Sequence, residues 1–351
     1  MLNEQDRKQI KKLGISEETI EKQLEYFRNG IKKVEVISPA TPGNGIETHR
    51  DEEIEEYTQY YDQNKTEYKT VKFVPASGAA TRMFRTLYEA LEFFKNNDNG
   101  INDYLHNNPI IADFFNQLDN YPFYSDLRKN LKEKELQPDY VIDIGRYDLI
   151  LKYLLGEEGL NYGNLPKGLL KFHIYEDESR TPLEEHFEEA SLYLKDDENK
   201  VYLHFTISPA HRELFEELSK HLIKRYKEEK GVNFEVNFSE QKRSTDTIAV
   251  DMNNEPFRKE NGELLFRPGG HGALIFNLND LDADIIFIGN IDNVAPDHTK
   301  PLRVRYKKYL GGFLITKVRE VHSILNKINH SDNNDQLRSD AIDLIKEISH
   351  D

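Results

Sequence analysis

From residue 71 onward, short strand-like runs of apolar and β-branched residues alternate with helix-like stretches, and this alternation constrains the fold more than any other feature. The strand-like runs lie at residues 71–75, 201–207, 233–238, 264–267 and 284–288. The helix-like stretches lie at residues 83–94, 209–228 and 273–281. Such alternation is typical of an α/β domain with a mainly parallel central sheet flanked by helices. In such domains, ligands bind beyond the carboxyl ends of the strands.

The N-terminal region, residues 1–70, reads as polar helices rather than as part of the sheet. Ser16 is expected to be an N-cap, and Ile20, Leu24 and Phe27 fall on one face of the following helix. A second, acidic helix is expected further along the region, at residues 51–61. We interpret this region as a packing appendage of the core.

The remaining segments complete the domain organisation. Residues 71–300 form the expected α/β core. Residues 96–162 interrupt it with helical, aromatic-rich sequence, which we interpret as an insertion. The C-terminal segment, residues 301–351, is expected to hold two helices, at residues 309–329 and 336–348.

Composition and charge exclude several classes of protein. The chain has 351 residues, no Cys and a formal charge of −16, from 47 Lys and Arg against 63 Asp and Glu. Without Cys, disulfides, thiolate zinc sites and cysteine nucleophiles are excluded. The negative field argues against nucleic acid as a partner, but a nucleotide needs only a local cationic pocket. No apolar run approaches the roughly 20 residues of a membrane span, and the N-terminus lacks the apolar core of a signal peptide, so we expect a cytoplasmic protein that binds no membrane.

The loop after the first strand of the core is a candidate phosphate-binding loop. Its small residues are Ser77, Gly78, Ala79 and Ala80. Small side chains let a phosphate approach the backbone, and the N–H groups that open the next helix offer positive potential. Thr81 could cap the helix or donate to the ligand, and Arg82 could form a charge-assisted fork with phosphate oxygens. The alternative is a tight turn with Arg82 in a salt bridge.

Two further segments place glycine beside a candidate ligand-binding residue. Lys167 stands between Pro166 and Gly168, which would fix the backbone and direct the ammonium group at a polyphosphate. The alternative is a surface turn with a solvated Lys167. The second segment follows a strand and opens a helix, and we expect its His to be a turn residue rather than a base. Its residues are Gly269, Gly270, His271 and Gly272.

Polar side chains after two other strands add candidates for a metal and for a base. Asp292 follows the most apolar strand, and its carboxylate would suit Mg²⁺, which keeps several waters and bridges to substrate phosphates. Asp297 is a second candidate oxygen donor. The alternative for Asp292 is an Asx-type turn that ends the strand. Gln241 could read the edge of a base with one donor and one acceptor.

In their order along the chain, these motifs resemble those of the UDP-sugar pyrophosphorylases, within the nucleotide-diphospho-sugar transferases. That class has a glycine-rich loop ending in Thr-Arg, then Pro-Lys-Gly, then Gln and glycine-rich nucleotide contacts, then a strand ending in Asp-Asn. The corresponding residues here are 77–82, 166–168, Gln241 with 268–272, and 290–293. The chain resembles an uncharacterised bacterial family, a domain of unknown function, related to those enzymes. The resemblance covers about residues 71–301 and implies a Rossmann-like core.

The resemblance also implies an activity. A nucleotidyl group would pass from a nucleoside triphosphate, with UTP favoured, to a sugar 1-phosphate, and pyrophosphate would be released. Residues 77–82 would hold the triphosphate, with Arg82 and Lys167 acting in catalysis. Asp292 would hold Mg²⁺ on the α-phosphate. Gln241 and residues 269–272 would bind the base and ribose.

Departures from the pattern of the class keep other functions open. The class usually has Gly where Ser77 and Ala80 stand, and a side chain at a position with positive φ costs about 1 kcal/mol or more. It also places Pro-Lys a few residues beyond Thr-Arg, whereas here the insertion separates Arg82 from Pro166. The main alternative is therefore a non-catalytic nucleotide or nucleotide-sugar binding protein. A glycosyltransferase ranks last, because no Asp-x-Asp stands at a strand end.

Overall fold

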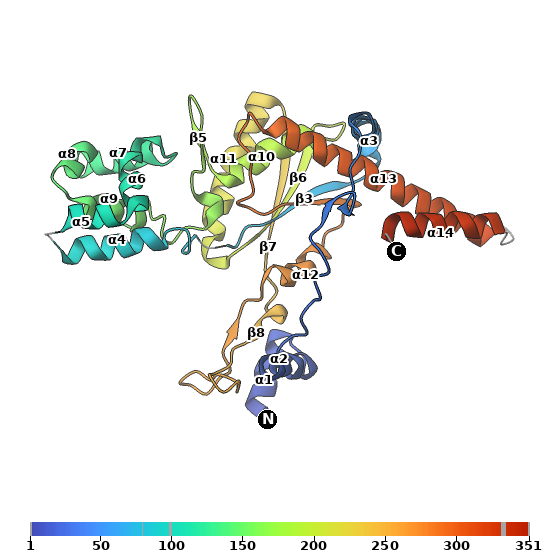
Figure 1. Ribbon diagram of the computed structural model, residues 1–351, viewed down its shortest axis with the longest axis horizontal. Coiled ribbons are helices and arrows are strands. Elements are labelled where there is room, and N and C mark those ends of the chain that lie inside the picture. The colour runs from blue at the N-terminus through green and yellow to red at the C-terminus, as the bar shows by residue number, and fades with distance from the viewer. Residues whose placement is uncertain (1, 79, 98–99, 331–334, 350–351) are drawn as a thin grey trace.

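The centre of the molecule is a parallel sheet of four strands in the order β10–β3–β6–β7 (Figure 1). The computed structural model describes residues 2–78, 80–97, 100–330 and 335–349. The four strands are β3 (Thr70–Pro75), β6 (Lys200–Ile207), β7 (Asn233–Glu240) and β10 (Ile285–Ile288). The predicted parallel sheet flanked by helices is thereby confirmed.

The carboxyl ends of the four strands meet at one edge of the sheet, because all four run in the same direction. Backbone hydrogen bonds continue past the strand ends at this edge. The N–H of Ala76 donates to the carbonyl of Thr206 at 2.7 Å, and the N–H of Ile291 donates to the carbonyl of Pro75 at 3.3 Å. These bonds fix the starts of the loops that follow β3 and β10.

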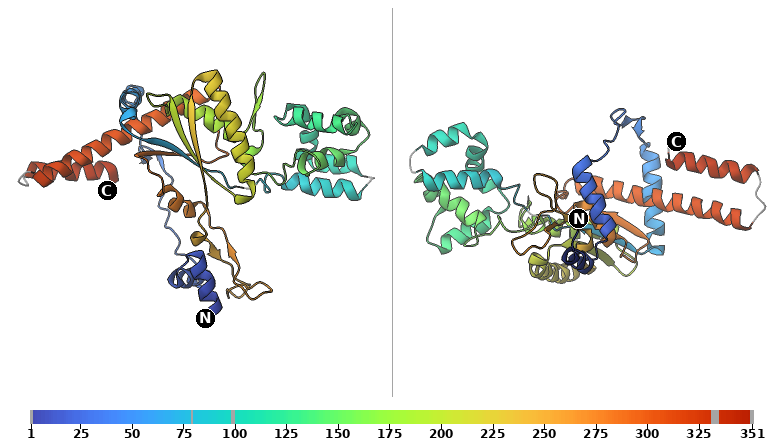
Figure 2. Two further views of the ribbon diagram at one scale, coloured as in Figure 1. Left: turned by 180° about the vertical axis from the view of Figure 1, so that it is seen from behind. Right: turned by 90° about the horizontal axis from the view of Figure 1, so that it is seen from below.

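Helices cover one face of the sheet and form the first hydrophobic core (Figure 2). Leu203 and Phe205 of β6 point to this face at the alternating period of a strand, and they belong to the same buried cluster as Phe187. Lys72 of β3 points to the same face, where it is buried and pairs with Glu189. The covering helices are α3 (Asp51–Asn64), α10 (Pro182–Tyr193), α11 (Arg212–Lys230) and α13 (Lys300–His330).

Six helices form a separate unit with its own hydrophobic core, drawn in cyan and green in Figure 1. They are α4 (Arg85–Asn96), α5 (Ile101–Asn107), α6 (Pro109–Asn116), α7 (Tyr124–Glu133), α8 (Pro138–Asp143) and α9 (Tyr147–Leu155). The helix predicted at residues 83–94 is α4, and it packs on α9 and α6 rather than on the sheet. Its buried residues, Ala90, Leu91 and Phe94, join the aromatic core of this unit. The helical unit therefore begins before residue 96.

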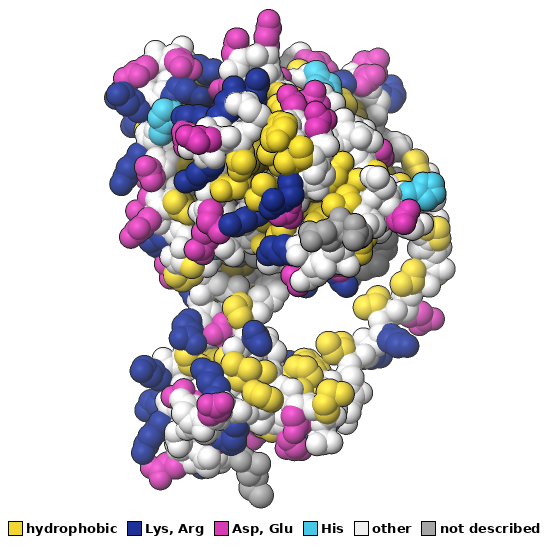
Figure 3. Space-filling model, turned by 90° about the vertical axis from the view of Figure 1, so that its left-hand side faces the viewer, with side chains coloured by type: hydrophobic (Ala, Val, Ile, Leu, Met, Phe, Trp, Pro, Cys, Tyr) yellow, Lys and Arg dark blue, Asp and Glu magenta, His cyan; other side chains and the backbone are white. Residues whose placement is uncertain are grey.

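The N-terminal helices pack on an antiparallel arm that lies outside the main sheet, and Figure 3 shows this module as a separate lobe. The run at residues 264–267, predicted as a strand of the parallel sheet, pairs antiparallel in this arm instead. Ser16 caps α2 as predicted, accepting from the N–H of Thr19 at 3.1 Å. Ile20 and Leu24 are buried, but Phe27 is 40% exposed because the narrow arm covers only part of the helix. The elements are α1 (Glu4–Leu13), α2 (Glu17–Asn29), β8 (Thr247–Ile248) and β9 (Phe266–Arg267).

Helix α13 extends away from the sheet, and α14 (Asp335–Ser349) folds back along it (Figures 1 and 2). Within the part of the chain that the structure describes, none of the helices combines the length and apolar character of a bilayer span. The helix predicted at residues 273–281 is shorter in the structure and follows a 3₁₀ turn. The remaining short elements are β1 (Thr41–Pro42), β2 (Gly45–Ile46), β4 (His173–Ile174), β5 (Ser179–Arg180) and α12 (Ile275–Leu278).

Candidate functional site

Four of the predicted site residues line one cleft at the carboxyl edge of the sheet. The cleft has a volume of about 710 Å³. Thr81 and Arg82 come from the loop after β3, Asp292 follows β10, and Lys167 lies between them. Because β3 and β10 are neighbours in the sheet, residues far apart in sequence meet here. The loop after β3, which supplies Thr81 and Arg82, leads from the sheet into the helical unit (Figure 1).

Lys167 reaches the cleft because its segment folds back beside the loop after β3. The N–H of Lys167 donates to the carbonyl of Gly78 at 3.2 Å, at the start of a short 3₁₀ turn, Lys167–Leu169. An added Cβ on Gly168 would lie 3.0 Å from side-chain atoms of Phe215 and Ile291. Glycine thus permits the close packing that holds this turn against the sheet. The insertion separates Arg82 from Lys167 in sequence but not in space.

An ion pair joins the two predicted catalytic and metal-binding groups. The Nζ of Lys167 donates to Oδ2 of Asp292 at 2.6 Å, and both side chains are partly exposed to the cleft. This hydrogen bond, reinforced by the positive charges of Lys167 and His271, holds the pKa of Asp292 below its ordinary value. Asp292 is therefore a carboxylate at neutral pH.

Arg82 supplies the second cation of the cleft. Its side chain is exposed, and neither a hydrogen bond nor an ion pair joins its guanidinium group to another residue in the described ranges. The alternative interpretation of Arg82, a structural salt bridge, therefore has no partner residue in the described ranges. An anion in the cleft would meet this free guanidinium group and the ammonium group that Lys167 shares with Asp292.

The sequence did not single out His186 of α10, which holds the turn that presents Asp292. Its Nε2 lies 3.2 Å from the carbonyl oxygen of Asn290 and 3.3 Å from that of Ile291, so the ring donates to this turn. Burial, together with the nearby charge of Lys72, lowers the pKa of His186 well below its ordinary value. The ring is neutral and acts as a positioning residue. The sequence around His186, an acidic helix, does not indicate that this ring contacts a carbonyl group 104 residues further along the chain.

A second residue outside the predicted set supports the same turn. Arg303 of α13 donates from Nη2 to Oδ1 of Asn293 at 2.7 Å, next to Asp292. Its Nε lies 3.5 Å from Oε2 of the buried Glu189, which also pairs with Lys72 at 3.0 Å. The buried carboxylate of Glu189 thereby anchors Arg303 and Lys72 beneath the site.

Asp297 does not serve as the second oxygen donor that its position suggested. Its carboxylate accepts from Arg180 at 2.9 and 3.0 Å and from Lys300 at 2.6 Å, and it does not line the cleft. Lys300 in turn pairs with the buried Glu185. Asp297 belongs to the ionic network that ties α10 to α13, and this use of its oxygens is the physical reason for the correction.

Gln241 and the glycine segment form a second group, at the end of β7. The Nε2 of Gln241 donates to the carbonyl of Gly269 and to Oγ1 of Thr245, both at 3.2 Å. A Cβ on Gly269 would lie 2.8 Å from the carbonyl oxygen of Thr245, so this position requires glycine. Gln241 thus holds its own loop, and among the described residues its amide oxygen has no hydrogen-bond partner.

This second group does not line the cleft around Lys167. In the sheet, β7 and β10 are separated by β3 and β6, which corresponds to three strand spacings of about 4.8 Å each. His271 and Gly272 are exposed, and the charge of His271 contributes to the lowered pKa of Asp292. An extended ligand would be needed to contact both groups.

The small residues after β3 differ in their surroundings. Gly78 is exposed, and a Cβ added there would meet no atom within 4 Å, so the loop leaves room for a ligand. Ser77 is half-buried and is not among the described residues with positive φ, so its side chain carries no such cost. Ala80 is buried in the core of the helical unit. Ala79 lies outside the described residues.

The fit of Mg²⁺ depends on what a substrate supplies. In the described ranges, no three His, Asp or Glu side chains gather into a group that could hold a metal ion. Asp292 offers one carboxylate, and Mg²⁺ commonly binds to one or two carboxylates with substrate phosphates and water completing its shell. The residues fit Mg²⁺ bound together with a phosphate ligand, provided that Asp292 exchanges Lys167 for the metal.

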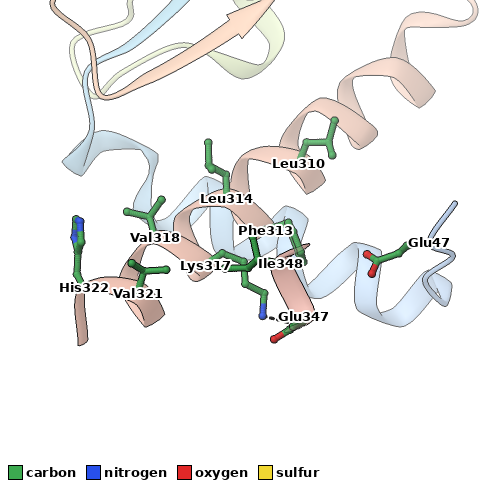
Figure 4. Close-up of a pocket in the computed structure, with 10 residues that line it drawn as sticks. All are labelled: Glu47, Leu310, Phe313, Leu314, Lys317, Val318, Val321, His322, Glu347 and Ile348. Atoms are coloured by element: carbon green, nitrogen blue, oxygen red, sulfur yellow. Dashed lines mark hydrogen bonds and ion pairs between the residues drawn. The ribbon is translucent and has the colours of Figure 1, made fainter. Parts of the chain in front are cut away.

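A different hollow, of about 540 Å³, lies between α13 and α14 (Figure 4). Apolar side chains such as Leu310, Leu314 and Val318 line it, and Lys317 pairs with Glu347 beside it at 2.5 Å. None of the predicted site residues lines this hollow. The cleft at the sheet edge, where charged groups converge, is therefore the candidate functional site.

Comparison with known proteins gives a family and no named activity. Neither a curated protein nor a solved structure matches the chain. The sequence matches the family described as "Domain of unknown function (DUF4301)" over residues 3–349, which is nearly its whole length. The chain therefore belongs to this family of unknown function.

Proposed function

We propose that this protein transfers a nucleotidyl group from a nucleoside triphosphate, with UTP favoured, to a sugar 1-phosphate and releases pyrophosphate. The observation that carries the proposal is the single cleft in which Arg82, Lys167 and Asp292 meet at the carboxyl edge of a parallel sheet. Ligands of Rossmann-like and nucleotide-diphospho-sugar transferase-like folds bind at such an edge. The cytoplasm would be the compartment for this reaction.

The chemistry asks the protein mainly for positioning and charge neutralisation. A phosphate oxygen of the sugar 1-phosphate attacks the α-phosphorus, and the bond from that phosphorus to the bridging oxygen of the β-phosphate breaks. Pyrophosphate leaves with the electron pair. Arg82 binds the triphosphate tail, and Lys167 neutralises charge that develops on the transferred phosphoryl group.

Asp292 would hold Mg²⁺, which supplies further neutralisation of phosphate charge when it is bound. Its low pKa keeps the carboxylate ready at neutral pH. His186 and Arg303 keep the turn around Asp292 in place, through the carbonyl of Ile291 and the side chain of Asn293. The amide oxygen of Gln241 and the loop of Gly269 would contact the base and ribose.

The runner-up is a non-catalytic protein that binds a nucleotide or nucleotide sugar. The observation that favours it is the Lys167–Asp292 ion pair, because each group neutralises the other at 2.6 Å. If a triphosphate does not separate the pair, neither residue reaches the phosphates and binding occurs without transfer.

Pyrophosphate exchange separates the two functions. The protein is incubated with Mg²⁺, labelled pyrophosphate and a panel of nucleotide sugars, and label in nucleoside triphosphate is counted. We expect incorporation with at least one UDP-sugar, and loss of at least about 100-fold of this rate in Asp292→Asn. Binding of nucleotide sugars with no incorporation from any of them would contradict the proposed transfer and favour the binding protein.

A further inference from the structure

An apolar groove opens beside the cleft, between the helical unit and the loop after β3. It has a volume of about 410 Å³ and is lined mainly by aromatic and aliphatic side chains of α4, α6 and the segments that follow. They include Phe84, Leu87, Ile110, Phe114, Tyr121 and Phe123. Met83 and Phe172 line both this groove and the cleft that contains Lys167. The apolar groove and the cationic cleft are therefore one continuous surface.

The groove is open to solvent at its rim and closed at its floor. Ile110 is 74% exposed and Met83 is 47% exposed, whereas Phe114 and Phe123 are buried. Exposed apolar side chains next to a built recess are typical of a binding surface rather than of a random surface position. The recess continues from solvent toward the core of the helical unit.

Few polar groups face the groove. Lys171 lines it, but its ammonium group pairs with Asp126 at 2.5 Å. The Tyr162 hydroxyl accepts from the N–H of Lys171 at 3.3 Å. The hydroxyl groups of an unsubstituted sugar would lose hydrogen bonds to water here and gain few in return, so the groove favours an apolar group.

We propose that the phosphate-bearing acceptor carries an apolar substituent, an alkyl, acyl or aryl group, that binds in this groove. Its phosphate lies beside Lys167, while Arg82 holds the triphosphate tail, and Met83 and Phe172 contact the junction between the two parts of the acceptor. The inference rests on the proposed function in placing the acceptor phosphate in the cleft. The transfer step and its leaving group are unchanged.

Binding of alkyl phosphates of increasing length tests this inference. Inorganic phosphate and ethyl, butyl and hexyl phosphate are titrated into the full-length protein by calorimetry. We expect affinity to rise about 4-fold for each methylene group that enters the groove, because that is the effect of burying one methylene. An affinity that does not depend on chain length would overturn the inference.

Two exposed isoleucines of the helical unit provide a matched pair of variants. Ile110 lines the groove, whereas Ile144 is 50% exposed and does not line it. Ile110→Asn should lower the affinity for hexyl phosphate about 10-fold and leave the affinity for inorganic phosphate unchanged. Ile144→Asn should change neither affinity. Met83→Gln gives a second test at the junction. Equal loss in Ile110→Asn and Ile144→Asn, or loss in neither, would place the alkyl chain elsewhere.

The exchange assay distinguishes failure of this inference from failure of the proposed function. The protein could bind alkyl phosphates in a manner that depends on chain length and on Ile110, yet show no pyrophosphate exchange. That result would support binding of an apolar substituent in the groove and would overturn the proposed transfer reaction. Pyrophosphate exchange by a protein that binds all alkyl phosphates with equal affinity would support the proposed transfer reaction. It would overturn the proposal that the groove binds an apolar substituent.

Discussion

At the residue scale, the candidate site depends on contacts that join distant parts of the chain. Arg82, Lys167 and Asp292 were singled out from the order of motifs along the chain, and the structure brings all three to one cleft, whereas their contact with phosphate stays a prediction. His186 and Arg303 could not be predicted, since their partners are defined by the fold and not by spacing. Sequence patterns thus indicated which groups could contact phosphate and missed the residues that hold them in position.

Replacing Lys167 tests its role directly. Lys167→Ala removes the ammonium group from the cleft, so we expect turnover to fall about 100- to 1000-fold while nucleotide affinity changes less than about 10-fold. Steady-state kinetics and calorimetric titration measure the two effects separately. Lys129→Ala, an exposed lysine of α7 outside the cleft, should leave both unchanged. An active Lys167→Ala enzyme with normal turnover would remove Lys167 from the mechanism.

The buried His186 predicts a pH dependence of stability. Its pKa in the folded protein lies well below the value near 6.5 of an unfolded chain, so the unfolded state binds more protons between these values. Its contribution to stability is present above about pH 6.5 and is lost as the pH falls, by up to about 1.4 kcal/mol per pH unit.

Urea unfolding at pH 7.5 and pH 5.0 checks this expectation. His186→Gln keeps a side-chain donor but does not titrate, so its free energy of unfolding should fall less on acidification than that of the unmodified protein. The same fall in both proteins would mean that other groups cause the acid sensitivity.

At the element scale, hydrophobic patterning predicted the four sheet strands well. The alternation of the buried Leu203 and Phe205 with the partly exposed Tyr202 and His204, for example, reflects one covered face of β6. Patterning does not identify the partner of an element. For this reason residues 264–267 were assigned to the sheet, although Phe266 and Arg267 pair with β8 and Leu264 bridges to Arg258. Likewise, α4 was expected beside the sheet, although it packs on α9.

The crossing of α13 over α3 depends on a glycine. A Cβ on Gly312 would lie 2.0 Å from the carbonyl oxygen of Tyr57, so the two backbones are in close contact. In an isolated helix, Ala would be favoured over Gly by about 1 kcal/mol. We expect the clash to prevail, so that Gly312→Ala lowers the free energy of unfolding by about 1 to 3 kcal/mol.

Denaturant unfolding measures this change. Ser323→Ala, at an exposed position of the same helix, serves as the control and should be neutral or slightly stabilising. A Gly312→Ala protein as stable as the control would contradict the close crossing.

At the scale of the whole molecule, three hydrophobic cores correspond to the sheet with its helices, the helical unit, and the N-terminal module. The candidate cleft lies at the boundary of the first two, since Met83 and Phe172 contribute to it together with Asp292. Residues 1–70 were predicted as one appendage, but Tyr61 of α3 joins the core of the sheet, and Ile248 and Leu264 join the core of the N-terminal module. The return of Lys167 to a position beside Gly78 could not be predicted, because a backbone hydrogen bond to Gly78 and the packing of Gly168 against Phe215 and Ile291 fix that placement.

We propose that the cleft at the sheet edge binds nucleotide phosphates together with Mg²⁺. This proposal is tested most directly by the melting temperature of the protein in the presence of UTP, ATP, GTP, CTP or TTP, each with and without Mg²⁺, because a ligand of the folded state raises that temperature. We predict a selective, Mg²⁺-dependent rise with one nucleotide, UTP, that is lost in Arg82→Ala. No rise with any nucleotide, or a rise of the same size in Arg82→Ala, would contradict the binding of nucleotide phosphates in this cleft.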